Sequence, residues 1–211
     1  MELTPAYVRA HVPALHDNAL IADMASHGTL SAFPTGEVIL RDRQFIDHIP
    51  LVTRGGAKVI RESGPEEHLF LYFLEAGQTC TMTLAACLRR QASRVRATTV
   101  APTEVILLPS SSVYRYSREF PAWNAFALLA QQDRFDTLMA TAEHIAFSSL
   151  AERLLTSLTG IARITGSREL TLTHEAIAGD LGVSRVGLSR VLKGLELDGR
   201  LRLGRGVIYL V

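Results

Sequence analysis

The sequence predicts an α+β chain in which a long helix joins a β-rich N-terminal domain to a small C-terminal domain of helices and a hairpin. The first observation is that short β-branched segments alternate with turn residues in the first half of the 211 residues. Secondly, glycine is absent from Phe120 until Gly160. Thirdly, apolar residues beyond that point recur first with a helical period and then as two short strands. A chain of this length accommodates two modest domains.

Residues 1–118 predict an antiparallel barrel or jelly roll. β-Branched segments recur there about every ten residues, with glycine or proline between them. We expect a few helical turns before the barrel, around residues 5–26. The expected strands are residues 37–40, 49–52, 58–60, 69–74, 95–100 and 104–109.

Residues 119–146 predict one long helix, with Pro121 in its first turn. At about 25 residues it would be roughly 37 Å long. An a/d seam, which excludes the charged residues, runs along it. Packing inside one subunit would also explain the seam, but a helix that links two domains favours a homodimeric coiled coil. The seam residues are Leu128, Gln131, Phe135, Leu138, Ala142 and Ile145.

Charge is unevenly distributed along a chain whose net charge is +1. Residues 147–211 hold nine basic residues (Lys or Arg) and six acidic residues (Asp or Glu). Residues 119–146 hold one basic residue and four acidic residues. A basic C-terminal module is compatible with a polyanionic partner. The N-terminal residues do not form a secretory signal, no apolar run is long enough to span a bilayer, and the two cysteines are too few for a disulfide scaffold. We therefore expect a cytoplasmic protein.

Residues 172–196 have the pattern of a helix-turn-helix. Thr173 is placed to cap a first helix, Gly182 to end it in a left-handed turn, and Ser184 to cap a second helix. Val183 is the apolar plug between the helices. The second helix turns aliphatic residues inward at Leu188, Val191, Leu192 and Leu195, and leaves Arg185, Val186, Ser189, Arg190 and Lys193 outward.

Arginines near the start of the second helix suit the reading of bases in a DNA major groove. Residues 201–211 add two strands that predict a wing, so residues 147–211 are expected to form a winged helix-turn-helix domain. Two amphipathic helices with solvated arginines are the alternative. The order of caps, plug, exposed arginines and hairpin favours the DNA-binding domain.

The stretch Val183-Ser184-Arg185-Val186-Gly187-Leu188-Ser189-Arg190-Val191-Leu192-Lys193-Gly194-Leu195-Glu196 resembles the cAMP receptor protein/fumarate–nitrate reduction regulator (CRP/FNR) superfamily. The family pattern there is S-R-E-x-x-[GS]-R-x-L-x-x-L-E. The resemblance covers essentially the whole chain and implies three parts: a jelly-roll sensor of the cyclic-nucleotide-binding type (1–118), a dimerisation helix (119–146) and a winged helix-turn-helix (147–211). It further implies a palindromic promoter site, and we expect RNA polymerase as a partner.

The resemblance assigns DNA contacts to individual residues. Arg185 and Arg190 match positions that read guanine, and a guanidinium can bond guanine O6 and N7 bidentately. Ser189 matches a serine that contacts base or phosphate. Phosphate contacts, which position the helix without specifying sequence, are expected from Thr173, Ser184 and Lys193.

Val186 departs from the family pattern, because most members carry glutamate there. Glutamate accepts a hydrogen bond from cytosine N4, whereas valine would favour a thymine methyl group. An Arg-Val pair at this point is similar to the cyanobacterial nitrogen-control regulators of the superfamily. We therefore group Val186 with the base-reading residues and expect an altered base preference.

The expected sensor lacks the residues that the family uses for cAMP. The ribose-binding glutamate and phosphate-binding arginine of cyclic-nucleotide members are missing from the stretch after Gly77, where Gln91 takes the arginine's place. The residues Arg89, Arg90 and Arg94 would hold another anion or be solvated. Two cysteines cannot ligate a four-cysteine iron–sulfur cluster. Carbon-monoxide sensors use a haem-ligating histidine where this chain has Thr83, which weakens the case for haem but leaves other ligands open.

Cys80 and Cys87 resemble a cysteine pair found at this point in a non-cAMP-binding branch of the superfamily, with one residue more between them. A thiol switch is one interpretation, in which oxidation, persulfidation or metal binding changes the DNA-competent population of dimers. The alternative is that both are buried, chemically silent side chains.

The sequence thus predicts a homodimeric DNA-binding regulator that responds to an effector or redox signal other than cAMP. It assigns no catalytic and no metal-binding residues: the seven histidines show no H-x-H or H-E-x-x-H spacing, and no nucleotide-binding or hydrolase motif occurs. A β-barrel small-molecule enzyme with an incidental helical domain is the alternative. A ligand-binding module that has lost DNA binding is a third interpretation.

Overall fold

The computed structural model describes residues 2–62, 68–147 and 149–211, and of residues 140–147 it describes the backbone alone. Two compact units make up the chain. The first comprises Met1–Val59 and Tyr72–Thr137, and the second comprises Ile60–Leu71 and Leu138–Val211. None of the helices in the described part combines the length and apolar composition needed to cross a membrane.

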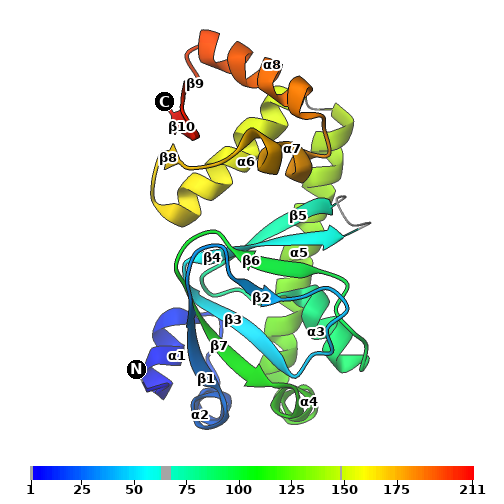
Figure 1. Cartoon of the computed structure of the whole chain (residues 1–211). Helices are drawn as coiled ribbons and strands as arrows, with labels where there is room; N and C mark the ends of the chain where they lie inside the picture. The colour runs from blue at the N-terminus through cyan, green and yellow to red at the C-terminus, as the bar shows by residue number, and fades with distance from the viewer. Residues whose placement is uncertain (1, 63–67, 148) are drawn as a thin grey trace. The chain divides into compact units, whose positions relative to one another are not determined.

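Two antiparallel sheets form the body of the first unit (Figure 1). One sheet has the order β1-β7-β3, and the other has the order β2-β6-β4-β5. This arrangement confirms the predicted N-terminal jelly-roll-like sheet domain. The strands are β1 (Thr29–Phe33), β2 (Val38–Leu40), β3 (His48–Arg54), β4 (Gly56–Glu62), β5 (His68–Glu75), β6 (Arg96–Thr99) and β7 (Thr103–Pro109). The end of β4 from Ile60 and the start of β5 up to Leu71 belong to the second unit.

A tight glycine turn and buried aliphatic residues shape the first unit around β3. Gly55, between β3 and β4, has a φ of 71°. A side chain at this position would also lie 2.3 Å from the carbonyl oxygen of Pro102, so only glycine fits. β3 contributes the fully buried Ile49, Leu51 and Val52 to the core.

Among the described residues, five helices accompany these sheets, and two of them were not predicted. Helices α1 (Pro5–His11) and α2 (Asn18–His27) lie where helical turns were expected, and α5 (Pro121–Phe147) is the predicted long helix. Helix α3 (Thr81–Leu88) buries side chains on several faces, so its sequence shows no clear helical period. Helix α4 (Ser110–Glu119) is mostly polar, and its only buried residues are Ser112, Val113 and Tyr116, so few apolar residues mark it in the sequence.

The second unit contains the C-terminal helices and a small sheet. Helix α6 (Leu150–Thr165) starts at the capping box that Ser149 and Glu152 form, and it is followed by α7 (His174–Leu181) and α8 (Arg185–Leu197). The predicted two-stranded wing, β9 (Leu201–Gly204) and β10 (Val207–Leu210), gains a third strand. This strand, β8 (Glu169–Leu170), pairs with β10 in the order β8-β10-β9.

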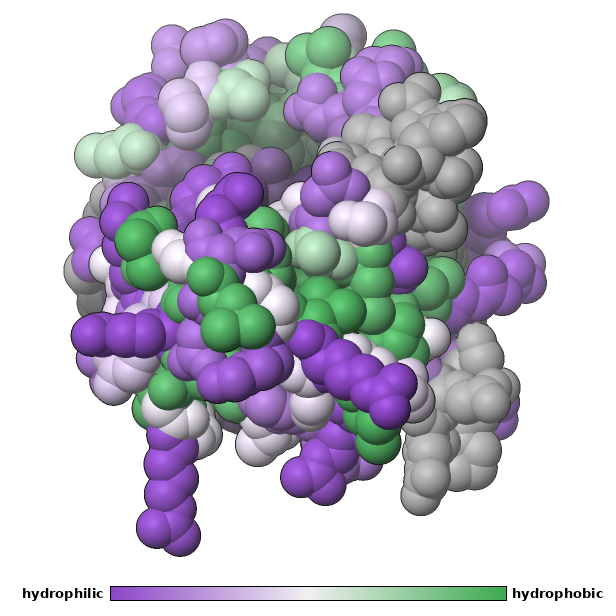
Figure 2. Space-filling model, turned by 90° about the horizontal axis from the view of Figure 1, so that it is seen from above, coloured by the Kyte–Doolittle hydropathy of each residue, from purple (hydrophilic) through white to green (hydrophobic). Residues whose placement is uncertain are grey.

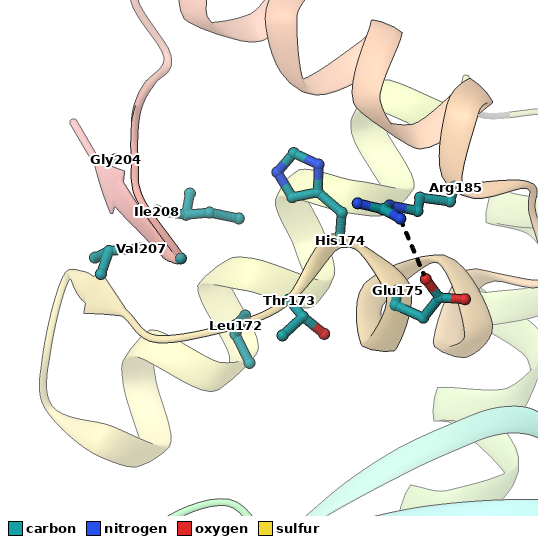
Figure 3. Close-up of a pocket in the computed structure, with 9 residues that line it drawn as sticks. Leu172, Thr173, His174, Glu175, Arg185, Gly204, Val207 and Ile208 are labelled. Atoms are coloured by element: carbon teal, nitrogen blue, oxygen red, sulfur yellow. Dashed lines mark ion pairs between the residues drawn. The ribbon is translucent and has the colours of Figure 1, made fainter.

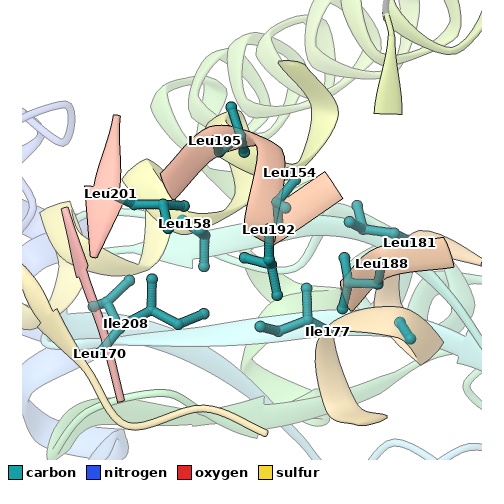
Figure 4. Packing of buried hydrophobic residues seen from close by; sticks show 11 residues of the cluster. Leu154, Leu158, Leu170, Ile177, Leu181, Leu188, Leu192, Leu195, Leu201 and Ile208 are labelled. Atoms are coloured by element: carbon teal, nitrogen blue, oxygen red, sulfur yellow. The ribbon is translucent and has the colours of Figure 1, made fainter. Parts of the chain in front are cut away.

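Aliphatic side chains from every element of this domain form its core (Figure 4). Leu154 and Leu158 of α6 and Leu188 and Leu192 of α8 are fully buried. Burying a leucine side chain contributes roughly 1.5–3 kcal/mol, so this cluster holds the helices and the sheet together. The other buried members are Leu170, Ile177, Ala178, Leu181, Leu195, Leu201 and Ile208.

Candidate nucleic-acid interface

Caps fix the boundaries of α7 and α8 at the predicted residues. The Thr173 hydroxyl oxygen accepts a hydrogen bond from the Ala176 N–H at 3.1 Å. The Ser184 hydroxyl oxygen accepts one from the Gly187 N–H at the same distance. Gly182 ends α7 in the left-handed conformation with a φ of 65°. Since each hydroxyl oxygen accepts from a backbone N–H, its own O–H remains available to donate to a phosphate oxygen.

The turn between the two helices is held from a third element. The Arg153 guanidinium of α6 donates a hydrogen bond at 2.8 Å to the carbonyl oxygen of Leu181, the last residue of α7. A cation at a helix C-terminus is favourable because the unpaired carbonyls there carry partial negative charge. Arg153 therefore stabilises the turn, a role that its position in the sequence did not reveal.

The outward face of α8 carries the residues predicted to contact DNA. Arg185, Val186, Arg190 and Lys193 are exposed, and Ser189 is half-buried. The opposite face of α8 is the leucine face that packs into the core, so the orientation of the exposed face is fixed. In the face of the molecule that Figure 2 shows, long hydrophilic side chains project outward with hydrophobic residues between them.

Two ion pairs restrain the basic side chains of α8 to different degrees. The Arg185 guanidinium lies 3.8 Å from the Glu175 carboxylate, and both side chains are largely exposed, so this pair is weak and Arg185 can turn to a base. Lys193 donates to Glu196 at 2.6 Å. Glu196 also accepts from the Leu203 N–H at 2.8 Å, which ties α8 to strand β9. These two hydrogen bonds lower the pKa of the Glu196 carboxyl.

A cavity of about 300 Å³ lies between the start of α7, the start of α8 and the wing (Figure 3). Polar and charged side chains on the α7 side face aliphatic side chains of β10. The lining residues are Leu172, Thr173, His174, Glu175, Arg185, Gly204, Gly206, Val207 and Ile208. On its α8 side, His174 is linked to Ser189: the His174 Nδ1 and Ser189 Oγ atoms are 3.0 Å apart.

The wing presents a further cation that the sequence did not single out. Gly206, with a φ of 74°, makes the turn between β9 and β10, and the preceding Arg205 is exposed at its tip. The Arg202 side chain, in contrast, lies over the Tyr209 ring, with its guanidinium carbon 5.2 Å from the ring centroid. The sequence signal that could have identified Arg205 is its place between Gly204 and Gly206, in a turn close to the helix-turn-helix.

In the first unit, Cys80 and Cys87 are both free and buried. Cys80 directly precedes α3, where its side chain makes no capping hydrogen bond, and Cys87 lies near the end of the helix. Seven residues of helix separate two α-carbons by about 10 Å along the axis, more than the roughly 7 Å that a disulfide spans. A disulfide between them thus requires α3 to unwind. Burial raises the pKa of the Cys87 thiol, which lowers its thiolate fraction.

A buried arginine of α5 lies beside this cysteine region. Arg134 is 7% exposed, and its guanidinium carbon is 4.2 Å from the centroid of the Tyr72 ring. It donates to the Gln78 side chain at 2.9 Å and to the Phe73 carbonyl oxygen at 3.3 Å, while its Nε has no hydrogen-bond partner among the described residues. The Tyr72 hydroxyl lies 3.5 Å from the Cys80 sulfur. The sequence offered no signal for this cluster beyond an arginine that lies off the seam.

The predicted seam of α5 is exposed wherever its side chains are described. Leu128 is 70% and Phe135 is 57% exposed, and Gln131 and Leu138 are exposed as well. The side chains of Ala142 and Ile145 lie outside the described residues. Leu129 and Met139, which were not predicted, are also exposed apolar residues of this helix. Elsewhere in the described chain, no group of three His, Cys, Asp or Glu side chains could hold a metal ion.

The capped helix pair, its exposed basic face and the adjoining hairpin define a winged helix-turn-helix domain, a DNA-binding class. Residues 149–211 match the protein family described as the Crp-like helix-turn-helix domain. A search of the curated proteins found no match.

Solved structures of CRP/FNR regulators share the fold of most of this chain. A transcriptional regulator of this family from Eubacterium rectale is 22% identical, with a TM-score of 0.79 over 92% of this chain and 90% of that one. The c-di-GMP responsive regulator CLP of Xanthomonas campestris is 18% identical, with a TM-score of 0.76 over 92% and 99%. A CRP/FNR regulator from Thermus thermophilus is 19% identical, with a TM-score of 0.74 over 87% and 93%. The comparisons favour a DNA-binding transcriptional regulator over the β-barrel enzyme.

Proposed function

We propose that the chain is a homodimeric, promoter-binding transcriptional regulator of the CRP/FNR type, located in the cytoplasm. Its proposed parts are a sensor domain (1–118), a dimerisation helix (119–146) and a DNA-binding domain (147–211). The observation that carries the proposal is the exposed basic face of α8, held outward by the leucine core behind it.

Each residue of that face has a chemical role in the proposal. Arg185 and Arg190 read guanine edges, and Val186 contacts a thymine methyl group. The Thr173 and Ser184 hydroxyls and the Lys193 ammonium contact phosphates and set the register of the helix. Arg185 and Arg190 are five residues apart on α8, which spaces them by about 7.5 Å along the helix axis.

Dimerisation is supported by the exposed apolar residues of α5. A helix that places Leu128 and Phe135 in solvent gains stability when a second copy covers them. A two-fold dimer also matches the symmetry of a palindromic site, whose half-sites lie about 34 Å apart. RNA polymerase is the further partner that a promoter-bound regulator requires to change transcription.

For the sensor we propose a signal other than cAMP, with a thiol switch at Cys80 and Cys87 as the first candidate. The proximity of Cys80 to Tyr72, which lies against Arg134, places that thiol in a polar cluster inside an otherwise apolar core. Modification of Cys80 would disturb contacts that join α3, β5 and α5. A change in the dimer population that binds DNA is the expected result.

The test is the salt dependence of DNA binding, measured by fluorescence anisotropy on a site selected from random duplexes. We expect affinity to fall steeply as salt rises, because Lys and Arg neutralise phosphates and release counterions.

Arg185→Ala and Arg190→Ala should each weaken binding to the selected site by about 5- to 150-fold. Arg118→Ala removes the same charge from an exposed position of α4 and serves as the matched control. Binding that is absent, or that does not respond to salt, would contradict the proposal.

A further inference from the structure

His174 and Ser189 connect the two helices of the helix-turn-helix. His174 is the first residue of α7, and Ser189 lies in the second turn of α8. Both side chains are half-buried, and the His174 Nδ1 is 3.0 Å from the Ser189 Oγ. Figure 3 shows the His174 ring rising from the start of α7 on the same side as the Arg185 guanidinium.

The state of the imidazole decides which way the hydrogen bond runs. A neutral ring that carries its proton on Nε2 accepts at Nδ1, so the Ser189 hydroxyl must donate to it and can offer only lone pairs to DNA. A protonated ring donates from Nδ1, so the hydroxyl oxygen accepts and its O–H becomes free to donate to DNA. One proton on His174 therefore reverses the polarity of Ser189.

The helix leaves the serine free for this role. A serine within a helix commonly donates to the carbonyl oxygen four residues earlier. In the part of the chain that the structure describes, the Ser189 hydroxyl makes no such bond to Arg185, and His174 is its partner.

We propose that His174 is a positioning residue that sets whether the Ser189 hydroxyl accepts or donates a hydrogen bond at the DNA surface. The inference rests on the proposed function, because it requires α8 to face DNA. At higher pH Ser189 accepts, and therefore prefers the amino groups of adenine or cytosine. At lower pH it donates, and therefore prefers guanine O6 and N7 or thymine O4. Histidine is suited to this role because its charge changes between pH 5 and 8.

Other charged groups near His174 come from both helices. Glu175 of α7 and Arg185 of α8 line the same cavity and pair with each other. The wing residues of that lining, Gly204, Gly206, Val207 and Ile208, carry no titratable side chain. Arg190 and Lys193 follow Ser189 on α8. A second imidazole, His68, contacts the opposite end of α7, where its Nε2 lies 3.0 Å from the Asp180 carboxylate, so it must be controlled separately.

The experiment measures base preference at each position of the selected site with the full chain at pH 6 and pH 8. In the parent, we expect the preference at one base pair per half-site to change by about three- to tenfold, the usual worth of one hydrogen bond. His174→Gln keeps a side chain that can bond Ser189 but does not titrate, so its preference should be the same at both pH values. Ser189→Ala should also abolish the change. His68→Gln is the matched control and should behave as the parent.

The remaining outcomes separate this inference from the proposed function. If the parent binds DNA in a salt-dependent manner with the same preference at both pH values, the role of His174 is wrong and the regulator proposal stands. A change in affinity that is uniform over all bases and persists in Ser189→Ala would show that His174 acts as a charge on phosphate, which also overturns it. If no salt-dependent binding occurs at either pH, the proposed function itself fails.

Discussion

Val186 is the residue of α8 whose chemistry least resembles that of its neighbours. It is 63% exposed on a face otherwise made of arginine, lysine and serine, so burial in the protein does not account for an aliphatic residue there. Its two methyl groups offer van der Waals contact and no hydrogen bond. On a base-reading helix this favours the C5-methyl group of thymine over the amino group of cytosine.

Replacing this residue should change the DNA sequence that is selected. We expect Val186→Glu to shift the preference at one base pair per half-site toward cytosine, with discrimination of about 1–3 kcal/mol, because the carboxylate accepts from cytosine N4. Selection from random DNA, followed by affinity measurements on the two consensus sites, gives the result. Val186→Gln has nearly the same reach without the charge and should favour adenine instead. An unchanged consensus in both variants would remove Val186 from the base-reading residues.

Helix α5 exposes several large apolar side chains. Leu128 and Phe135 are seven residues apart, which places them on one side of the helix two turns from each other. Thr137 is two residues beyond Phe135 and so faces nearly the opposite way. Contact between two copies along this face would cover the apolar side chains and leave Thr137 in solvent.

A charge on the seam should therefore dissociate the proposed dimer. Phe135→Lys would bring two ammonium groups together across the two-fold axis, and we expect it to sediment as a monomer in analytical ultracentrifugation. Affinity for a palindromic site should fall by about 10²-fold or more, while affinity for a single half-site should stay unchanged, because only the joint binding of two domains is lost. Thr137→Lys adds the same charge on the other side and should remain dimeric. A monomeric parent would contradict the seam.

How far the sequence predicted each element depends on whether the deciding interactions are local. The caps Thr173 and Ser184, the turn at Gly182 and the inward leucines of α8 act within a few residues, and all were predictable. Strand β8 has only two residues and forms because it pairs with β10, so no local sequence pattern predicted it. The role of Arg134 was equally hidden, because its partners Tyr72 and Gln78 lie more than fifty residues away in the sequence.

For the molecule as a whole, the proposed function requires a signal in the first unit to alter DNA binding by the second. Cys80 and Cys87 are buried, so a reagent reaches them only when α3 opens. Their separation along α3 excludes a disulfide in the folded helix, so persulfidation or oxidation to a sulfenic acid would modify one thiol at a time. Cys80 is the more consequential of the two because its sulfur contacts Tyr72, which lies against the buried Arg134 of α5.

Oxidation should therefore change DNA binding through Cys80. We expect peroxide or a persulfide donor to change the affinity of the parent for its selected site by at least about fivefold, because 1 kcal/mol of coupling between two sites corresponds to that factor. Cys87→Ser should respond like the parent, whereas Cys80→Ser and the double variant should not. Burying a serine hydroxyl in place of a thiol costs free energy. The measurement is therefore repeated with the corresponding alanine variants, which bury no polar group. Mass spectrometry identifies the modified residue, and an equal response in the parent and the double variant would end the thiol switch.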